Sequence, residues 1–249
     1  MKKKLLITND DGINAPGILA LYRAVKDHYD VVIAAPEKQK SGTGIGLTLH
    51  RSIGIKQVNW PDETKAWSIE GKPADCVKLG CSVLLDYKPD MIISGINHGG
   101  NSGRNIIYSG TVGGAMESVI RGIPAMAFSC VDEEDPDYEG VQKFIPGLIQ
   151  HFFDHPLPRG TLANINFPNC RTESIAGVKY ARQGLSYFLE KPFKCDKTQG
   201  YFISKQWDAH DEHDESDTSY LEQGFITATP IHVNEMTDLD HYNSHKELV

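Results

Sequence analysis

The sequence predicts an α/β protein built on a doubly wound, mostly parallel β-sheet. Short apolar, β-branched runs alternate with segments of helical periodicity, and the first strand, helix and strand fit within residues 4–36. Such strand–helix–strand units place their strands in parallel in one sheet. The helical signals fade after residue 168. We therefore expect a core over residues 1–168 and a β-rich C-terminal arm over residues 169–249.

The first unit fills the N-terminal part of the chain. We expect strands at residues 4–8 and 30–36, with a helix over residues 17–28 between them. Pro16 suits the first turn of that helix. The apolar residues of the helix recur at i, i+3, i+4 and i+7, which is typical of a buried helix face. These residues are Ile18, Leu21, Tyr22 and Val25.

The same alternation continues to residue 168. Pro146 lies inside one predicted helix, where a proline can kink the chain. The expected helices cover residues 74–86, 110–121 and 141–153, and the expected strands cover residues 89–97, 123–130 and 161–168. Further extended segments are expected at residues 47–58, 66–71, 177–184, 200–207 and 224–233, and residues 208–217 form a polar, acidic insert.

Composition and charge exclude several classes of protein. The net charge of −8, without a basic stripe, argues against binding of duplex nucleic acid. No apolar run reaches the roughly eighteen residues that a membrane-spanning helix needs, and the basic start MKKK soon runs into aspartates, unlike a signal peptide. The five cysteines match no zinc or disulfide spacing and fit reduced thiols. We therefore expect a cytoplasmic protein without a membrane span.

Polar residues gather where the predicted strands end. The first strand runs directly into two adjacent carboxylates, Asp10 and Asp11. Ligands of open α/β sheets bind at the carboxyl ends of the strands, so the polar segments at these ends should meet at one edge. The other segments are SGTG (41–44), SGIN (94–97) with HGGNSGRN (98–105), and YSGTVGG (108–114) at a predicted helix start.

This combination of residues indicates phosphate chemistry. Two adjacent carboxylates repel one another unless a cation lies beside them, and carboxylate, hydroxyl and amide oxygens favour Mg²⁺, Mn²⁺ or Ca²⁺ over zinc. The helix start suits an anion, because glycines allow close approach and the first N–H groups point outward. A cation beside an anion site suits phosphoester hydrolysis, since the cation neutralises phosphoryl charge and lowers the pKa of a water molecule.

Other catalytic motifs are absent or fit poorly. The sequence has no GxxxxGK[ST] loop and no GxSxG elbow. Phosphatases with an Asp-x-Asp pair do not match the adjacent Asp10 and Asp11, and GTGIG (42–46) lacks the spacing of a dinucleotide fingerprint. His210 and His213 lie in the acidic insert and fit a solvated loop better than a metal site.

At these residues the sequence resembles the SurE family, the survival proteins that act as metal-dependent 5′-nucleotidases. Six ordered segments carry the resemblance, and together they are far more specific than any one of them. They are LLITNDDGINAPGI (5–18), APEKQKSGTG (35–44), GKPADCVKLG (71–80), ISGINHGGNSGRNIIYSGTVGGAMES (93–118), NINFP (164–168) and GFITATPI (224–231).

The resemblance implies a Rossmann-like, three-layer core that holds one divalent metal ion per subunit, Mg²⁺ or Mn²⁺ with Ca²⁺ as an alternative. It implies nucleoside monophosphates as substrates, and homodimers that exchange C-terminal segments and sometimes pair into homotetramers. The implied metal ligands are Asp10, Asp11, Ser41 and Asn97, of which Asp10, Asp11 and Asn97 are also catalytic. The implied phosphate-binding residues are Ser109, Gly110 and Thr111, with Gly42 and Asn101 nearby.

Two places depart from the family's pattern. Asn105, beside Arg104, stands where members often carry an acidic residue, and Tyr220 stands where a small residue is expected. These departures leave the implied metal ligands untouched and bear on substrate preference. Two other functions stay open: a broader phosphatase for 3′-nucleotides, short polyphosphate or sugar phosphates, and a sensor that binds nucleotides in a metal-dependent way without turnover.

Overall fold

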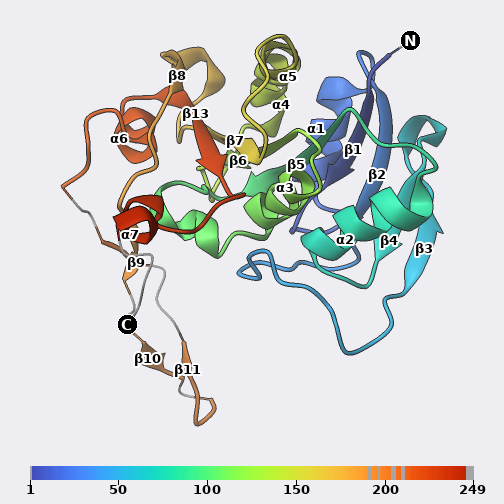
Figure 1. Ribbon diagram of the computed structural model, residues 1–249, viewed down its shortest axis with the longest axis horizontal. Helices are drawn as coiled ribbons and strands as arrows, with labels where there is room; N and C mark the ends of the chain where they lie inside the picture. Colours follow the sequence, from blue (N-terminus) through green and yellow to red (C-terminus); the bar gives the residue numbers. More distant parts are fainter. Residues whose placement is uncertain (1, 190–191, 196, 203–205, 209–210, 245–249) are drawn as a thin grey trace.

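A nine-stranded sheet forms the centre of the molecule, in the order β3-β4-β2-β1-β5-β6-β7-β13-β8 (Figure 1). The computed structural model describes residues 2–189, 192–195, 197–202, 206–208 and 211–244. The strands of the sheet are β1 (Lys4–Thr8), β2 (Asp30–Pro36), β3 (Ile55–Val58), β4 (Ala66–Ile69), β5 (Met91–His98), β6 (Ala125–Cys130), β7 (Thr161–Phe167), β8 (Gly177–Tyr180) and β13 (Phe225–His232).

The predicted doubly wound, mostly parallel sheet is confirmed. Six consecutive strands of the sheet run parallel to one another: β4, β2, β1, β5, β6 and β7. At the two ends of this group, β3 pairs antiparallel with β4 and β13 pairs antiparallel with β7. Parallel strands covered on both faces are apolar along their whole length. In β1, Leu5 and Ile7 pack into one core cluster and Leu6 packs into another on the opposite face.

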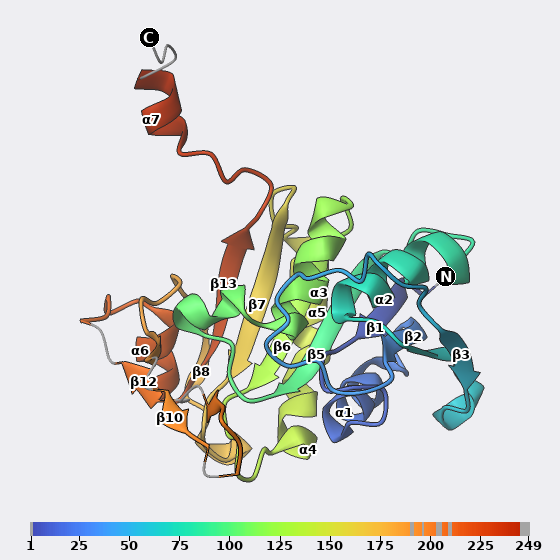
Figure 2. The same cartoon turned by 90° about the horizontal axis from the view of Figure 1, so that it is seen from below.

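Helices cover both faces of the sheet, which gives three layers (Figures 1 and 2). On one face α1 (Pro16–Val25) packs against α4 (Tyr138–Val141) and α5 (Ile145–Asp154). On the other face α2 (Pro73–Leu79) packs against α3 (Gly110–Ile120). The central parallel strands β2, β1, β5, β6 and β7 are therefore largely buried on both sides, and their carboxyl ends emerge at one common edge of the sheet.

Two predicted helices differ from the structure in detail. The helix expected at residues 74–86 ends at Leu79 and continues as one π-helical stretch, Gly80–Leu84. The helix expected at residues 141–153 is divided into α4, a 3-10 turn and α5. Pro146 lies in the first turn of α5, where a missing N–H is tolerated, so it begins a helix instead of kinking one.

The sheet continues past residue 168, because β8 and β13 extend it beyond β7. The short helix α6 (Asp217–Glu222) packs against β13. Strands β9 (Tyr187–Leu189), β10 (Phe193–Lys194), β11 (Tyr201–Phe202) and β12 (Gln206–Asp208) pair as β9 with β12 and β10 with β11. We call the four strands β9 to β12 the hairpin; β10 and β11 project from the body in Figure 1, and α7 (Leu239–Ser244) projects in Figure 2.

Candidate active site at the carboxyl edge of the sheet

The structure brings the first strand, the β5 end and the start of α3 into contact. Asp10 follows β1 and is almost fully buried, with 3% of its surface exposed. The Thr111 hydroxyl, in the first turn of α3, donates a hydrogen bond to Asp10 Oδ1 and lies 3.3 Å from Asn97 Oδ1. Three residues that are distant in the sequence therefore form one polar cluster.

Glycine and serine at the start of α3 make this close approach possible. A Cβ atom on Gly110 would lie 2.7 Å from the Asp10 Cβ, so only glycine allows the helix start to approach the carboxylate. Ser109 is the N-cap residue, and its hydroxyl accepts a 3.1 Å hydrogen bond from the Val112 N–H. The positive end of the α3 dipole is thus directed at the carboxylate cluster.

Asp11 lies in a second group of polar atoms beside the first. Its Oδ2 accepts a 3.0 Å hydrogen bond from the His98 N–H, at the end of β5. The Gln39 amide nitrogen lies 3.5 Å from Asp11 Oδ1 and donates a 2.9 Å hydrogen bond to Ser41 Oγ. Ser41 is therefore linked to Asp11 through Gln39.

The two carboxylates lie in an unfavourable environment for negative charge. Burial, the largest effect, raises the pKa of Asp10 from its ordinary 3.8 to about 6; the Thr111 hydrogen bond opposes this rise and the nearby Asp11 adds to it. Burial also raises the pKa of Asp11. Among the ion pairs of the described residues, none joins a lysine or arginine to either aspartate. A bound cation would supply the missing positive charge.

The available ligands fit a hard divalent cation. Asp10 and Asp11 offer carboxylate oxygens, Asn97 an amide oxygen and Ser41 a hydroxyl, which together match Mg²⁺, Mn²⁺ or Ca²⁺. Within the described part of the chain, no cluster of three or more His, Cys, Asp or Glu side chains could hold a metal. The chemistry of this set therefore fits an oxygen-liganded cation and not a zinc centre.

Gly42 and Asn101 lie outside these direct contacts. Gly42 has a φ of +72°, with open space where a side chain would be. Asn101 is 6% exposed, and its amide nitrogen donates to Ser129 Oγ at 2.8 Å while its N–H donates to Asn166 Oδ1 at 2.8 Å. Asn101 is therefore fixed by a buried polar network at the ends of β6 and β7.

Two residues near the site were not predicted. Gln39 bridges Asp11 and Ser41. The sequence could have indicated it, because Gln39 lies two residues before Ser41 in the same loop. Tyr138, at the start of α4, has a raised pKa, chiefly through burial and also through the charge of Asp11. Tyr138 lies in the acidic stretch DEEDPDYEG (132–140) after β6, and only the tertiary packing brings it close to Asp11.

The departures from the family's pattern lie in two elements: Arg104 and Asn105 in the 3-10 turn Gly103–Ile107 before α3, and Tyr220 in α6. Asn105 is buried, Arg104 is exposed, and the Tyr220 ring packs edge-on against Phe225 with 5.9 Å between centroids. His210 lies outside the described residues. His213 is exposed, and its Nδ1 accepts a 3.1 Å hydrogen bond from the Glu215 N–H within the same turn.

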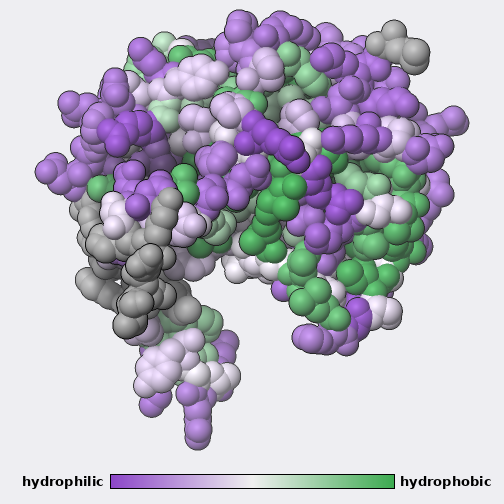
Figure 3. Space-filling view, viewed as in Figure 1, coloured by the Kyte–Doolittle hydropathy of each residue, from purple (hydrophilic) through white to green (hydrophobic). Residues whose placement is uncertain are grey.

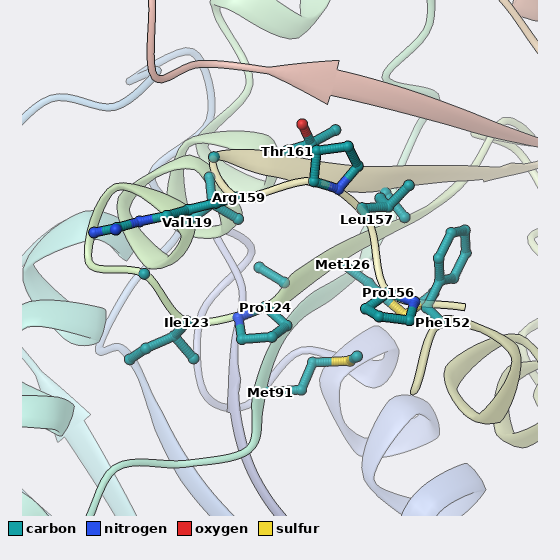
Figure 4. A pocket seen from close by; sticks show the side chains of 15 residues that line it. Met91, Val119, Ile123, Pro124, Met126, Phe152, Pro156, Leu157, Arg159 and Thr161 are labelled. Carbon is teal, nitrogen blue, oxygen red and sulfur yellow. The ribbon is translucent and has the colours of Figure 1, made fainter. Parts of the chain in front are cut away.

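A cavity of about 230 Å³ lies at the opposite edge of the sheet (Figure 4). Its lining includes Met91, Ala125 and Thr161, the first residues of β5, β6 and β7. Most of its other lining side chains are apolar, such as Val119 and Phe152, and no carboxylate lines it. The carboxylate cluster at the carboxyl edge, and not this cavity, carries the groups needed for phosphate chemistry.

Comparisons with known proteins agree with this architecture. The family model described as "Survival protein SurE" matches residues 5–190. The chain is 38% identical over 245 residues to the 5′-nucleotidase SurE of Protochlamydia amoebophila (strain UWE25), covering 96% of this chain and 94% of that protein. It is 40% identical over 243 residues, with the same coverage, to the 5′-nucleotidase SurE of Thermoanaerobacter sp. (strain X514).

A solved structure shows the same fold. The crystal structure of the SurE protein from Aquifex aeolicus matches with a TM-score of 0.84 and 35% sequence identity, covering 98% of both chains. The matched family model includes both aspartates, the Ser41 loop, the end of β5 and the start of α3. With this agreement in sequence, in fold and along nearly the whole chain, the protein belongs to the SurE family.

Proposed function

We propose that this protein is a metal-dependent 5′-nucleotidase, which hydrolyses nucleoside 5′-monophosphates to a nucleoside and phosphate. The observation that carries the proposal is the buried Asp10, beside Asp11 and at the N-terminus of α3, without a lysine or arginine ion pair among the described residues. Relatives named 5′-nucleotidase SurE match over nearly the full chain. The proposed enzyme is thus a phosphoric monoester hydrolase.

One divalent cation per subunit, Mg²⁺ or Mn²⁺ with Ca²⁺ as an alternative, is part of this proposal. When bound, such a cation neutralises charge on the phosphoryl oxygens and makes water more acidic. Asp10 and Asp11 would hold it and, with Asn97, fix the position of the attacking water relative to phosphorus. Ser41 would complete the protein's share of its ligands.

The start of α3 would bind the phosphate. Ser109, Gly110 and Thr111 occupy the first turn, where N–H groups and the helix dipole favour an anion. The Thr111 hydroxyl already donates toward the carboxylate cluster, so a phosphate held there would lie beside the cation. Gly42 and Asn101 would bound the same site from the adjoining loops.

The proposal extends to assembly and location. The hairpin and α7 would exchange between subunits of a homodimer, which could pair into a homotetramer. Exposed apolar residues support this, and Figure 3 shows apolar as well as polar surface on the projecting part of the hairpin. The exposed apolar residues are Phe193, Tyr201, Phe202, Met236, Leu239 and Tyr242.

No helix in the described residues is both long and apolar enough to cross a membrane. We propose a cytoplasmic location and no binding of duplex nucleic acid.

Phosphate release tests the proposed activity. We expect release from AMP and GMP with Mg²⁺ or Mn²⁺, and none after treatment with EDTA. Comparable rates on 3′-AMP or tripolyphosphate would indicate the broader phosphatase instead. Binding of AMP without turnover, even with Mn²⁺, would indicate the sensor. Full activity in EDTA would contradict the role given to the cation.

A further inference from the structure

Asp217, at the start of α6, has an unusual environment for a residue of the acidic insert. It is fully buried, at 0% exposure, although the neighbouring Asp214 is exposed. Its carboxylate accepts hydrogen bonds from the N–H groups of Gly184 at 2.9 Å and Thr218 at 2.8 Å. It also accepts from the Gly103 N–H, which lies 3.2 Å from each of its oxygens.

The Gly103 bond matters because of where Gly103 lies. We call residues 101–105 the rim segment: it begins with Asn101, one of the residues proposed to bound the phosphate site. Asp217 is 114 positions away in the sequence, so this contact joins the C-terminal arm to the rim segment within one chain. The Asp217 carboxylate thus joins the rim segment and Gly184 to the start of α6, through hydrogen bonds to a charged acceptor, which are stronger than those between neutral groups.

Residues 183–186 hold the same rim segment from a second side. The Gln183 amide donates to the Gly103 carbonyl at 3.0 Å, and the Arg104 N–H donates to the Ser186 carbonyl at 2.9 Å. Gly103 has a φ of +58°, and a Cβ there would lie 2.4 Å from the Ser186 oxygen. The rim segment and residues 183–186 are therefore packed backbone against backbone.

A second acidic residue holds residues 183–186 in turn. Glu212 accepts hydrogen bonds from the N–H groups of Leu185 at 2.9 Å and Ser186 at 2.6 Å. Burial, the largest single effect, acts to raise the pKa of Glu212, but these hydrogen bonds together with that of the Ser186 hydroxyl lower it. The acidic insert thus supplies two carboxylates that bind backbone N–H groups, and one of them reaches the rim segment directly.

We infer that Asp217 is a positioning residue for substrate binding, which fixes the rim segment at the edge of the active site through its contact with Gly103. The inference rests on the proposed function, because it takes the rim segment to border the site where the nucleotide binds. Asp217 itself touches neither the carboxylate cluster nor the start of α3 among its hydrogen bonds. Its loss should therefore weaken substrate binding more than the chemical step.

Steady-state kinetics with Asp217→Asn test this inference. The amide keeps one acceptor oxygen where the carboxylate served three N–H groups, so the rim segment loosens. We expect the KM for AMP to rise about tenfold while kcat stays within about threefold. Gln183→Ala, which removes only the contact to the Gly103 carbonyl, should raise KM by about threefold. The matched control is Asp214→Asn, an exposed change of the same charge nearby, which should alter neither constant.

Hydrogen exchange gives a readout that does not depend on activity. Asp217→Asn should speed amide exchange in the rim segment, at Gly103 and Arg104, by about tenfold or more, whereas Asp214→Asn should not. Faster exchange confined to residues 183–186 and 216–219, or a fall in kcat at constant KM, would show a purely local structural role and overturn the inference. Absence of AMP turnover in the unmodified protein would instead contradict the proposed function, and the exchange result would still decide whether Asp217 fixes the rim segment.

Discussion

At the scale of single residues, Asp10 carries the clearest prediction. Asp10→Asn keeps the shape of the side chain but removes a charge that the cation needs, so kcat/KM for AMP should fall by at least about a hundredfold. Isothermal titration with Mn²⁺ should show correspondingly weaker binding. Asp27→Asn is the matched control, since Asp27 is exposed just after α1. Unimpaired turnover by Asp10→Asn would contradict the proposed mechanism.

The raised pKa of Asp10 predicts a pH dependence at the same scale. Burial raises this pKa to about 6 in the metal-free protein, so a proton competes with the cation below that pH. Apparent Mn²⁺ affinity should fall about tenfold per pH unit below pH 6, measured by titration. The stability of the metal-free fold changes with pH in the opposite direction. Between pH 3.8 and about 6 the folded protein binds more protons at Asp10 than the unfolded chain does, so the stability that this protonation contributes is lost as pH rises through about 6. Affinity that stays constant down to pH 5 would contradict the assignment of Asp10 as a ligand.

At the scale of one element, the N-terminus of α3 combines a structural and a proposed binding role in Ser109. Ser109→Ala removes the cap to the Val112 N–H and should lower the free energy of unfolding in urea by about 1 kcal/mol. It should also raise the KM for AMP. Ser118→Ala removes a buried hydroxyl from the far half of the same helix, where it donates to the Gly114 carbonyl at 2.8 Å. That control should lose stability with the KM for AMP unchanged. If the KM is the same in both variants, Ser109 caps the helix but does not bind the substrate.

At the scale of the whole molecule, the projecting hairpin predicts assembly. Phe202 is 53% exposed and stacks on Phe193, with 5.3 Å between ring centroids, on a hairpin that extends away from the body. Phe202→Asp should convert the proposed homodimer to a monomer in light scattering after size exclusion. Val83→Asp changes an apolar side chain of 64% exposure outside the hairpin and should leave the mass unchanged. A monomeric unmodified protein would contradict the proposed exchange.

The sequence located the central strands because burial on both faces leaves a local signature. Strands covered by helices on each side read as continuous apolar runs, and those at β1, β2, β5, β6 and β7 were found within about two residues. Helix ends were harder, as at Leu79 and Pro146, because local periodicity does not show where a helical stretch changes its hydrogen-bonding pattern. The same limit applied to β3, which occupies only the end of the extended segment expected at residues 47–58.

By itself, the sequence determined the parallel core and the chemical character of its carboxyl edge: two adjacent aspartates, a hydroxyl loop, an asparagine and a glycine-rich helix start. Only the tertiary structure decided which of these touch. Asp10 meets Thr111 across 101 positions, and Gly103 meets Asp217 across 114. It also placed β13 between β7 and β8. The physical reason is that periodicity records which face of an element is buried, whereas the partner that covers it is selected by packing among distant segments.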